Sequence, residues 1–491
     1  MAAKHVSVTT RRSLMQAVGS LIAAATVVPG SARAAPQAAV SAWMTTLSTY
    51  MSEAGSRALP AEVMEKTKHH ILDTFGAMIS GADLPPGQVA LRFARAYAGQ
   101  PVGTVAASNI VAGPLEAALA NGMLAHSDET DDSHEASHCH PGCAIVPAAL
   151  AAGEQFGVDG MRFLRAVALG YDIGPRVTMT LGGLRYQMET HRSTHSIAST
   201  FGAAAAAGCA AELDAQEMRW LLDYAAQQAS GIAAWQRDIE HVEKSLVFAG
   251  MPARNGVNAA LLIRLGSNGV PDIFSGSDNF LMAFAPNADP TKLVDKLGER
   301  YEVTQTNIKK WTVGSPIQAP LDAVEIIRGK RPFEADQVKS VIVRVASSDA
   351  NTVNNRDMPD ICLQHMLAVM LIDKTASFRA AHDKPRMQNP EILRQRAKVQ
   401  LVFDEELERL SPRRISIVEL TFDDGTRLSE QVEYVRGTVQ NPMMREEIVS
   451  KTLDLITPML GVAKGKALVD TILDIESVKN IRELRPVLQR T

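Results

Sequence analysis

Alanine-rich apolar runs in the first half of the chain constrain the fold more than any other feature. They lie at residues 115–125, 144–153, 201–211 and 225–234. Alanine has the highest helix propensity, and its small side chain lets neighbouring helix backbones approach each other closely. A helix that is apolar on all sides needs other helices around it. The runs therefore predict the interior of a helical bundle that extends from about residue 41 to residue 265.

The pattern changes near Tyr301 and becomes helical again at Asn441. Further strands and helices are expected between these points, with strands at residues 301–309, 338–345, 399–403, 415–422 and 427–434 and helices at residues 316–328 and 363–371. The Asp423-Asp424-Gly425 turn signal joins the last two strands as a hairpin. We therefore predict a mainly α protein, in which residues 40–295 and 439–491 form one large all-helical domain and residues 296–438 form an inserted α+β lid domain.

Composition indicates a globular protein and argues against a nucleic-acid partner. The 491 residues are 46% hydrophobic and 21% charged, with a formal net charge of −4. This balance supports a large core and differs from that of disordered chains. No dense block of lysine and arginine is present to follow a phosphate backbone, so we expect no nucleic-acid partner.

Residues 1–34 have the features of an export signal. Arg11-Arg12 precedes a mildly apolar stretch at residues 15–28, and Ala32-Arg33-Ala34 fits an A-x-A cleavage site. Adjacent arginines before a weakly apolar region resemble the signal read by the twin-arginine export machinery. We expect cleavage near Ala34 and a periplasmic protein, with no membrane association after signal removal because no other stretch reads as a membrane span.

The four cysteines are too few for a disulfide scaffold. Cys139 and Cys143 are close in sequence, and an oxidising compartment would permit a local disulfide between them. We expect two separate thiols instead. Cys209 and Cys362 are interpreted as packing residues.

The segment that we call the polar loop, residues 126–142, carries the strongest chemical signal. It holds four histidines and five carboxylates between two apolar helices, and a segment this polar is not expected in the core. The loop could be a metal site, a solvated surface loop, or an active-site loop in which carboxylates and imidazoles share protons. Residues 134–138 have the H-E-x-x-H spacing, but they lie in a predicted loop and not on the helix on which that motif binds zinc, and the polar loop contains no C-x-x-C spacing. We therefore favour an active-site loop and predict no metal ligands.

At this loop the sequence resembles the MmgE/PrpD family. The matching motifs are A-N-G-M-L-A-H at residues 120–126, Asp131-Asp132, H-P-G at 140–142, G-Y-D-I at 170–173, T-F-G-A-A-A at 200–205, K-S-L-V-F-A-G at 244–250 with A-R-N-G-V at 253–257, and I-K-K-W at 308–311. Their order and spacing span most of residues 45–460. The family includes 2-methylcitrate dehydratase, cis-aconitate decarboxylase and iminodisuccinate epimerase. The resemblance implies a helical domain with an α+β lid, a homodimer, and no metal, iron–sulfur cluster or other cofactor.

The resemblance also assigns catalytic positions in the polar loop. The catalytic aspartate of the family falls on Glu129 when the motif is aligned without gaps, and Asp128 is adjacent. The threonine of the family falls on Ser133. Its loop histidine maps to His140 through the H-P-G match, or to His138 if the insertion lies elsewhere.

Further positions follow outside the loop. The second histidine of the family maps to His195 or His191, and its two lysines map to Lys244 and Lys309. Val353 stands where decarboxylases of the family carry a tyrosine in the lid. This difference argues against cis-aconitate decarboxylation as the specific activity.

The predicted mechanism is removal of a proton from a carbon beside a carboxylate. Lys244, Lys309 and Arg356 are expected to bind substrate carboxylates and to stabilise the developing negative charge. His140 or His195 would serve as the general base or acid. Two further acids of the loop, Asp131 and Asp132, either orient histidines or cap the following helix.

We therefore predict a cofactor-independent lyase, similar to a dehydratase, that acts on a small polycarboxylate such as a methylcitrate-like acid. An isomerase, epimerase or decarboxylase of a related acid is the close alternative. A periplasmic protein that binds a metal or a carboxylate without turnover is the alternative from another class.

Overall fold

The computed structural model describes residues 39–411 and 413–490, and the predicted export signal lies outside them. Residues 40–491 form one compact unit. Helices dominate the described residues and strands are few, which confirms the prediction of a mainly α protein with a small α+β portion.

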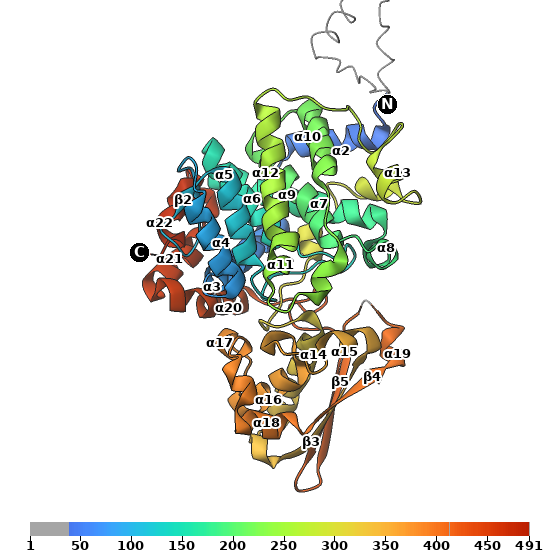
Figure 1. Cartoon of the computed structure of the whole chain (residues 1–491), viewed down its shortest axis with the longest axis vertical. Helices are drawn as coiled ribbons and strands as arrows, with labels where there is room; N and C mark the ends of the chain where they lie inside the picture. Colours follow the sequence, from blue (N-terminus) through green and yellow to red (C-terminus); the bar gives the residue numbers. More distant parts are fainter. Residues whose placement is uncertain (1–38, 412, 491) are drawn as a thin grey trace, which may run out of the picture. The chain divides into compact units, whose positions relative to one another are not determined.

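The part of the chain that we call the helical part is built from both sides of the α+β insertion. Its main helices are α2 (Ala42–Glu53), α3 (Ala61–Gly81), α4 (Pro85–Ala96), α5 (Pro114–Ala125), α6 (Gly142–Phe156), α7 (Gly160–Leu181), α8 (Gly183–Thr190), α9 (Thr194–Ala210), α10 (Ala215–Gln228), α11 (Val242–Ser245), α12 (Met251–Arg264), α13 (Phe280–Phe284), α20 (Arg445–Leu460), α21 (Val462–Leu473) and α22 (Arg485–Leu488). Two short strands, β1 (Gly103–Thr104) and β2 (Val111–Ala112), pair antiparallel before α5. The C-terminal helices α20 and α21 pack against α3, on the side of the helical part where the chain ends (Figure 1).

A buried ion pair joins the two ends of the helical part. The ammonium of Lys451 on α20 lies 2.6 Å from the carboxylate of Asp73 on α3, and it also donates to the carbonyl of Thr130 at 3.0 Å. Because both side chains are buried, the pair and the hydrogen bond together replace the water that the charges lose. The C-terminal return of the chain therefore supports the polar loop directly.

Small residues let the central helices α7 and α9 approach closely. A Cβ on Gly170 would lie 2.5 Å from Ile145 and 2.8 Å from the carbonyl of Gly202, so no larger residue fits there without movement. The alanine-rich run at residues 225–234 is the exception to the predicted pattern, because α10 ends at Gln228. Gly231, with a φ of 97°, then turns the chain in a conformation that other residues adopt rarely.

The run Val242–Arg264 is the one described segment long and apolar enough to cross a membrane. In its most apolar window 56% of the residues are buried inside the protein. Burial against neighbouring helices is the property of a core helix.

The α+β part follows residue 310. Its elements are α14 (Ser315–Lys330), β3 (Val338–Ala346), α15 (Ser347–Val353), α16 (Leu363–Asp373), α17 (Phe378–Ala381), α18 (Pro390–Arg396), β4 (Val399–Asp404), α19 (Glu405–Glu408), β5 (Ser416–Phe422) and β6 (Arg427–Val432). The sheet order is β4-β3-β5-β6, with β3 and β4 parallel and the other pairs antiparallel. The predicted hairpin is present as β5 and β6. Helices α14 and α16 pack on the sheet (Figure 1).

The predicted strand at residues 301–309 is wrong. Residues Glu302–Gln305 form a 3₁₀ turn instead. The backbone N–H of Glu302 donates to the carboxylate of Asp172, and the guanidinium of Arg176 binds the carbonyl of Arg300 at 2.8 Å. Side chains of α7 therefore satisfy backbone groups that a strand would have offered to a neighbouring strand.

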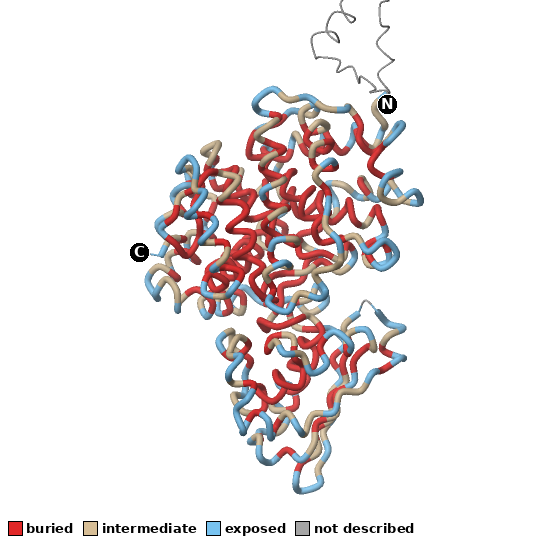
Figure 2. The backbone as a smooth tube through the Cα atoms, viewed as in Figure 1, coloured by how far each residue is buried: buried red, intermediate tan, exposed pale blue. Residues whose placement is uncertain are grey.

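Two large hydrophobic clusters form most of the core of the described residues, and Ala346, Leu407 and Ile415 form a small third one. The first includes buried residues from Met44 to Ile308 and from Met443 to Leu488, and the second includes buried residues from Trp311 to Val435. The first cluster fills the helical part and the second lies between the sheet and its helices. Figure 2 shows buried backbone in both the helical part and the α+β part.

Candidate active site

The polar loop is buried, which corrects the expectation that such a segment stays out of the interior. His126 and Asp131 have no exposed surface, and Asp132 is 1% exposed. Burial of this much charge is tolerated only where each group has a partner. The carboxylates of the loop have such partners, and these partners define the site.

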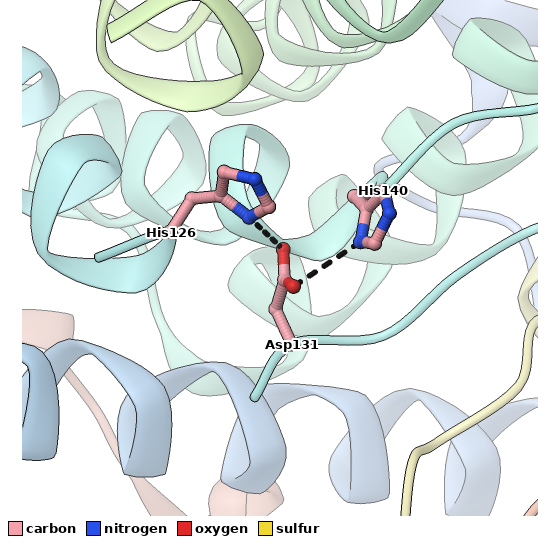
Figure 3. A group of neighbouring side chains, drawn as sticks. All are labelled: His126, Asp131 and His140. Atoms are coloured by element: carbon pink, nitrogen blue, oxygen red, sulfur yellow. Dashed lines mark hydrogen bonds and ion pairs between the residues drawn. The ribbon is translucent and has the colours of Figure 1, made fainter. Parts of the chain in front are cut away.

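Asp131 holds two imidazoles of the loop at the same time. One carboxylate oxygen lies 2.8 Å from Nδ1 of His126 and the other lies 3.1 Å from Nδ1 of His140 (Figure 3). A carboxylate accepts hydrogen bonds, so both imidazoles carry a proton on Nδ1. This arrangement leaves Nε2 of His140 free of the proton and able to accept one.

Asp132 belongs to the scaffold of the loop. Its carboxylate accepts hydrogen bonds from the hydroxyl of Tyr171 at 2.5 Å, from Nδ1 of His70 at 2.8 Å and from the N–H of Gly142 at 3.0 Å. Gly142 is the first residue of α6. Asp132 thus caps the following helix, which is one of the two roles predicted for it, whereas Asp131 has the orienting role.

Glu129 lies at the centre of a cluster of cations. Its carboxylate pairs with the ammonium of Lys244, lies 3.0 Å from Nε2 of His241 and lies 3.4 Å from the ammonium of Lys309. Lys309 also donates to the carbonyl of Glu129 at 2.8 Å. Burial alone would raise the pKa of Glu129, but the two lysines and His241 lower it well below its usual range. The site therefore contains a buried carboxylate that stays ionised.

Asp128 turns away from this cluster. Its carboxylate accepts the hydroxyl of Thr130 at 2.5 Å and lies 3.0 Å from Nε2 of His382, which belongs to the α+β part. Asp128 is 3% exposed, so this contact is interior.

A π-helical turn places one aromatic ring between two imidazoles. Residues Leu246–Gly250 form this turn between α11 and α12, and π turns are frequent at functional sites. The ring of Phe248 stacks on His195 with 3.9 Å between centroids and on His126 with 4.6 Å. His138, whose φ is 52°, places its ring 4.9 Å from that of His195.

The histidines open onto a cavity of about 370 Å³. The helical part contributes Ser133, His138, His140 and His195 to its wall, and Lys309 lines it as well. The predicted residues Ser133, His138, His140, His195 and Lys309 are thus brought together around one space. Glu129, Asp131 and Lys244 are linked to this group through hydrogen bonds and ion pairs but are not part of the wall.

Two predicted residues lie elsewhere. His191 is exposed at the C-terminal end of α8 and does not line the cavity, because its φ of 59° ends the helix one turn before His195. Arg356 lies in the loop after α15, also outside the cavity wall. Val353, which replaces the tyrosine expected in decarboxylases, is fully buried in the core of the α+β part.

The sequence analysis did not assign several groups that the site contains. Three arginines of the α+β part, Arg413, Arg414 and Arg436, line the cavity. His241 bonds Glu129 three residues before Lys244, but it precedes α11 in a left-handed conformation with a φ of 64°, so no helical spacing could have identified it. No local pattern marks the arginines, because they come from loops that follow Leu410 and Val432.

The four cysteines are free and buried, as expected for separate thiols. Burial and nearby carboxylates raise the pKa of the Cys143 thiol well above its usual value. A thiol in this state is a poor nucleophile. Cysteine chemistry is therefore not part of the candidate site.

Two groups of side chains have donor atoms close enough to hold a metal ion. The first is His126, Asp131 and His140, and the second is His126, Glu129 and His241. The ammonium of Lys309 already lies close to the carboxylate in each group, 3.6 Å from Asp131 and 3.4 Å from Glu129. A metal cation would have to compete with these charges.

Burial favours the neutral form of three imidazoles of the cavity, His138, His140 and His195. It lowers the pKa of His140, although Asp131 acts in the opposite direction, and it lowers the pKa of His138 to about 3. Burial together with His138 and His140 holds the pKa of His195 well below its usual value. In contrast, Glu129 and Asp131 overcome the effect of burial on Lys309 and raise its pKa. The cavity thus presents neutral bases beside a fixed cation, an arrangement suited to proton abstraction from an anion.

The chain is similar in sequence to proteins named as cis-aconitate decarboxylases. The chain matches a cis-aconitate decarboxylase of Aspergillus terreus with 24% identity over 470 residues, which cover 88% of this chain and 92% of that protein. It matches the human cis-aconitate decarboxylase with 23% identity over 456 residues, 88% of this chain and 91% of that protein. A cis-aconitate decarboxylase-like protein of Aspergillus oryzae is 27% identical over 316 residues. This match covers 60% of this chain and 64% of that protein, which is less than two thirds of its length.

Domain matches cover most of the described chain. Residues 45–293 match the MmgE/PrpD N-terminal domain and residues 311–476 match the MmgE/PrpD C-terminal domain. The buried loop with its paired carboxylates, the histidines on the cavity and the two lysines lie within these matches. The chain therefore belongs to the MmgE/PrpD family.

Proposed function

We propose that the protein is a lyase that removes a proton from the carbon beside a carboxylate of a small polycarboxylate. The observation that carries the proposal is the hydrogen bond from His140 to Asp131, because the imidazole of His140 lines a cavity that Lys309 also lines. Enzymatic proton abstraction needs a positioned base that is unprotonated at the working pH and a cation beside the developing charge. Relatives named as decarboxylases support a lyase of this general kind.

His140 is the proposed general base. Asp131 fixes its Nδ1–H, so that Nε2 can take the proton, and the carboxylate stabilises the imidazolium that then forms. His195, 5.3 Å from His140 between ring centroids, is proposed to receive this proton from His140 and then to return it to the product or to the leaving group. His195 has no carboxylate partner among the described residues, which makes it the weaker base of the two.

Lys309 and Arg413 are the proposed carboxylate ligands. The Lys309 ammonium is held by Glu129 at one side of the cavity. Arg414 pairs with Asp349 and Arg436 pairs with Glu447, whereas the guanidinium of Arg413 lies 3.8 Å from its nearest carboxylate. Arg413 therefore has the most freedom to bind an incoming anion, in the role expected of Arg356.

Dehydration is the reaction that we favour for the second half of the mechanism. Val353 supplies no hydroxyl where decarboxylases of the family carry a tyrosine, and it is buried away from the cavity. Decarboxylation is the second candidate, favoured by the names of the relatives, and in it the abstracted proton is returned to the carbon that loses carbon dioxide. Epimerisation or isomerisation would follow if the same carbon is reprotonated without loss of a group.

Product analysis separates these outcomes. The purified chain is incubated with citrate, 2-methylcitrate, cis-aconitate and substituted succinates, and products are identified by NMR and by release of carbon dioxide. Loss of water from a hydroxy acid supports dehydration, release of carbon dioxide supports decarboxylation, and inversion supports epimerisation. His140→Gln and His195→Gln should each reduce the rate at least about 100-fold. His191→Gln decides the alternative mapping, because a comparable loss would return His191 to the site.

Binding without turnover is the rival from a different class. It would place a metal ion on His126 with Asp131 and His140, or on His126 with Glu129 and His241. Stoichiometric zinc or iron in purified protein, with no product from any acid, would replace the lyase proposal.

We also propose that the protein acts in the periplasm as a homodimer. Arg11-Arg12 and Ala32-Arg33-Ala34 support export, although these residues lie outside the described structure. Cell fractionation of the wild type and of a chain with both arginines changed to lysine tests the route. Light scattering of the purified protein tests the dimer.

A further inference from the structure

His382 links the α+β part to the polar loop. It follows α17 and its Nδ1 donates to the carbonyl of Phe378 at 2.7 Å, while its Nε2 lies 3.0 Å from a carboxylate oxygen of Asp128. The ring also packs on Phe378, with 4.2 Å between centroids. The side chains of His382 and Asp128 are 14% and 3% exposed. The contact is therefore a largely dry one between segments 254 positions apart in the sequence.

The two ring contacts require a charged imidazole. A carbonyl accepts only, so Nδ1 of His382 carries a proton. A lone pair on Nε2 would then face an ionised carboxylate 3.0 Å away, which is repulsive. Protonation of Nε2 converts this repulsion into an ion pair, even though the ring is not aligned for an ideal hydrogen bond.

The carboxylates around His382 also favour its charged form. Burial alone would lower the pKa of His382, but Asp128 and Asp360 raise it to about 9. Burial and the charges of Asp128 and Glu129 raise the pKa of Asp360 to about 7, so part of the Asp360 population is ionised at neutral pH. Lys244 is the further charge near Asp360.

Asp128 is placed to transmit this contact to the site. Its carboxylate also closes a turn on the N–H and the hydroxyl of Thr130, which fixes the backbone on both sides of Glu129. The carbonyl and the carboxylate of Glu129 hold Lys309. A shift of Asp128 would therefore move the cation that lines the cavity.

We propose that His382 is a positioning residue, whose imidazolium pairs with Asp128 and so couples the α+β part to the loop that carries Glu129 and Lys309. The consequence for catalysis rests on the proposed function. The coupling itself does not, because it concerns only the order of the polar loop. Its failure can thus be told apart from failure of the lyase proposal.

Hydrogen exchange of the polar loop tests the coupling in the full chain. Protection of amides in residues 126–140 is compared by mass spectrometry in the wild type, His382→Gln, Asp128→Asn and the double variant, after correction for intrinsic rates. We expect each single variant to lose about tenfold protection and the double variant to lose no more than either one. His365→Gln is the matched control, since His365 is a buried histidine of the same part whose ring nitrogens have no hydrogen-bond partner among the residues that the structure describes. It should leave the loop unchanged.

A pH series gives a readout that a purely structural role would not produce. The raised pKa of His382 means that the ion pair is complete at neutral pH and is lost as pH rises through about 9. Wild-type protection should fall over that range and His382→Gln should show no such step. Unchanged protection in His382→Gln, or a step that persists in it, would overturn the proposal. The wild-type series and Asp128→Asn decide the question even if His382→Gln does not fold.

Activity provides the second readout on any acid that the wild type converts. His382→Gln should lower kcat/KM about tenfold, and His382→Lys, which restores a positive charge, should recover part of it. Loss of activity in His382→Gln with intact loop protection would also contradict the proposal, because the effect would then not pass through the loop.

Discussion

Replacement of Asp131 by asparagine tests the core of the site. The side chain keeps its size, but its single acceptor oxygen can serve only one of the two imidazoles that the carboxylate now holds at 2.8 and 3.1 Å. A hydrogen bond to a charged group contributes about 1.5 to 3 kcal/mol. We expect the free energy of unfolding to fall by about this amount, since Asp131 is fully buried and no water can replace the lost contact.

The same loss should appear in the rate. If the missing interaction is the one that stabilises the His140 imidazolium, about 1.5 to 3 kcal/mol corresponds to roughly a 10- to 150-fold lower rate. The pKa of His140 should also fall further, because Asp131 is the group that opposes the effect of burial on it. The lower limb of the pH–rate profile should therefore move to more acidic pH.

Two assays measure these effects. Urea unfolding gives the change in stability, and initial rates between pH 5 and pH 9 give the change in activity. Asp132→Asn is the matched comparison, because Asp132 is equally buried and accepts hydrogen bonds but touches neither His126 nor His140. It should lose similar stability without the shift in pH profile. A rate within threefold of wild type in Asp131→Asn, with an unmoved profile, would refute the reasoning.

Three further predictions concern stability. Glu129→Gln should lower the free energy of unfolding, measured in urea, by about 3 to 5 kcal/mol, because it removes the buried carboxylate that Lys244 and Lys309 share. A loss below about 1 kcal/mol would contradict the stabilising role of these ion pairs. Lys451→Met should cost a similar ~3 to 5 kcal/mol by stranding Asp73, whereas exposed Lys330→Met should change urea stability by less than about 1 kcal/mol. The pKa values of Asp128, Glu129 and Asp131 are depressed in the folded state, so the stability that these ionised carboxylates contribute is present above their ordinary pKa range and is lost as pH falls below about 4. Thermal unfolding should therefore show a steep fall in Tm below that pH. The difference in Tm between the wild type and Asp131→Asn should become smaller over the same range.

Much of the fold follows from local sequence patterns. The alanine-rich runs became α5, α6 and α9, and the alternating residues became β3, because small apolar side chains and β-branched side chains each favour one element with little help from the rest of the chain. The expected strand at residues 301–309 failed because Asp172 and Arg176 on a distant helix satisfy its backbone. No local pattern contains that information.

The site was accessible from the sequence to a smaller extent. His140, His195, Lys244 and Lys309 were located through a family resemblance, and the structure places them around the cavity and its charge cluster. Burial of the polar loop could not be foreseen, since it depends on His70, Tyr171 and Lys451 from other helices. His382 and Arg413 are absent from the sequence-based site for the same reason.

Deuterium uptake from heavy water tests the central claim most directly. The wild type and His140→Gln are incubated with a polycarboxylate of the panel in heavy water, with and without a chelator, and deuterium at the carbon beside the carboxylate is measured by NMR. The account predicts uptake or deuterated product with the wild type that survives the chelator and falls at least about 100-fold in His140→Gln. Absence of uptake with every acid, uptake that the chelator abolishes, or uptake unchanged in His140→Gln would contradict proton abstraction by His140.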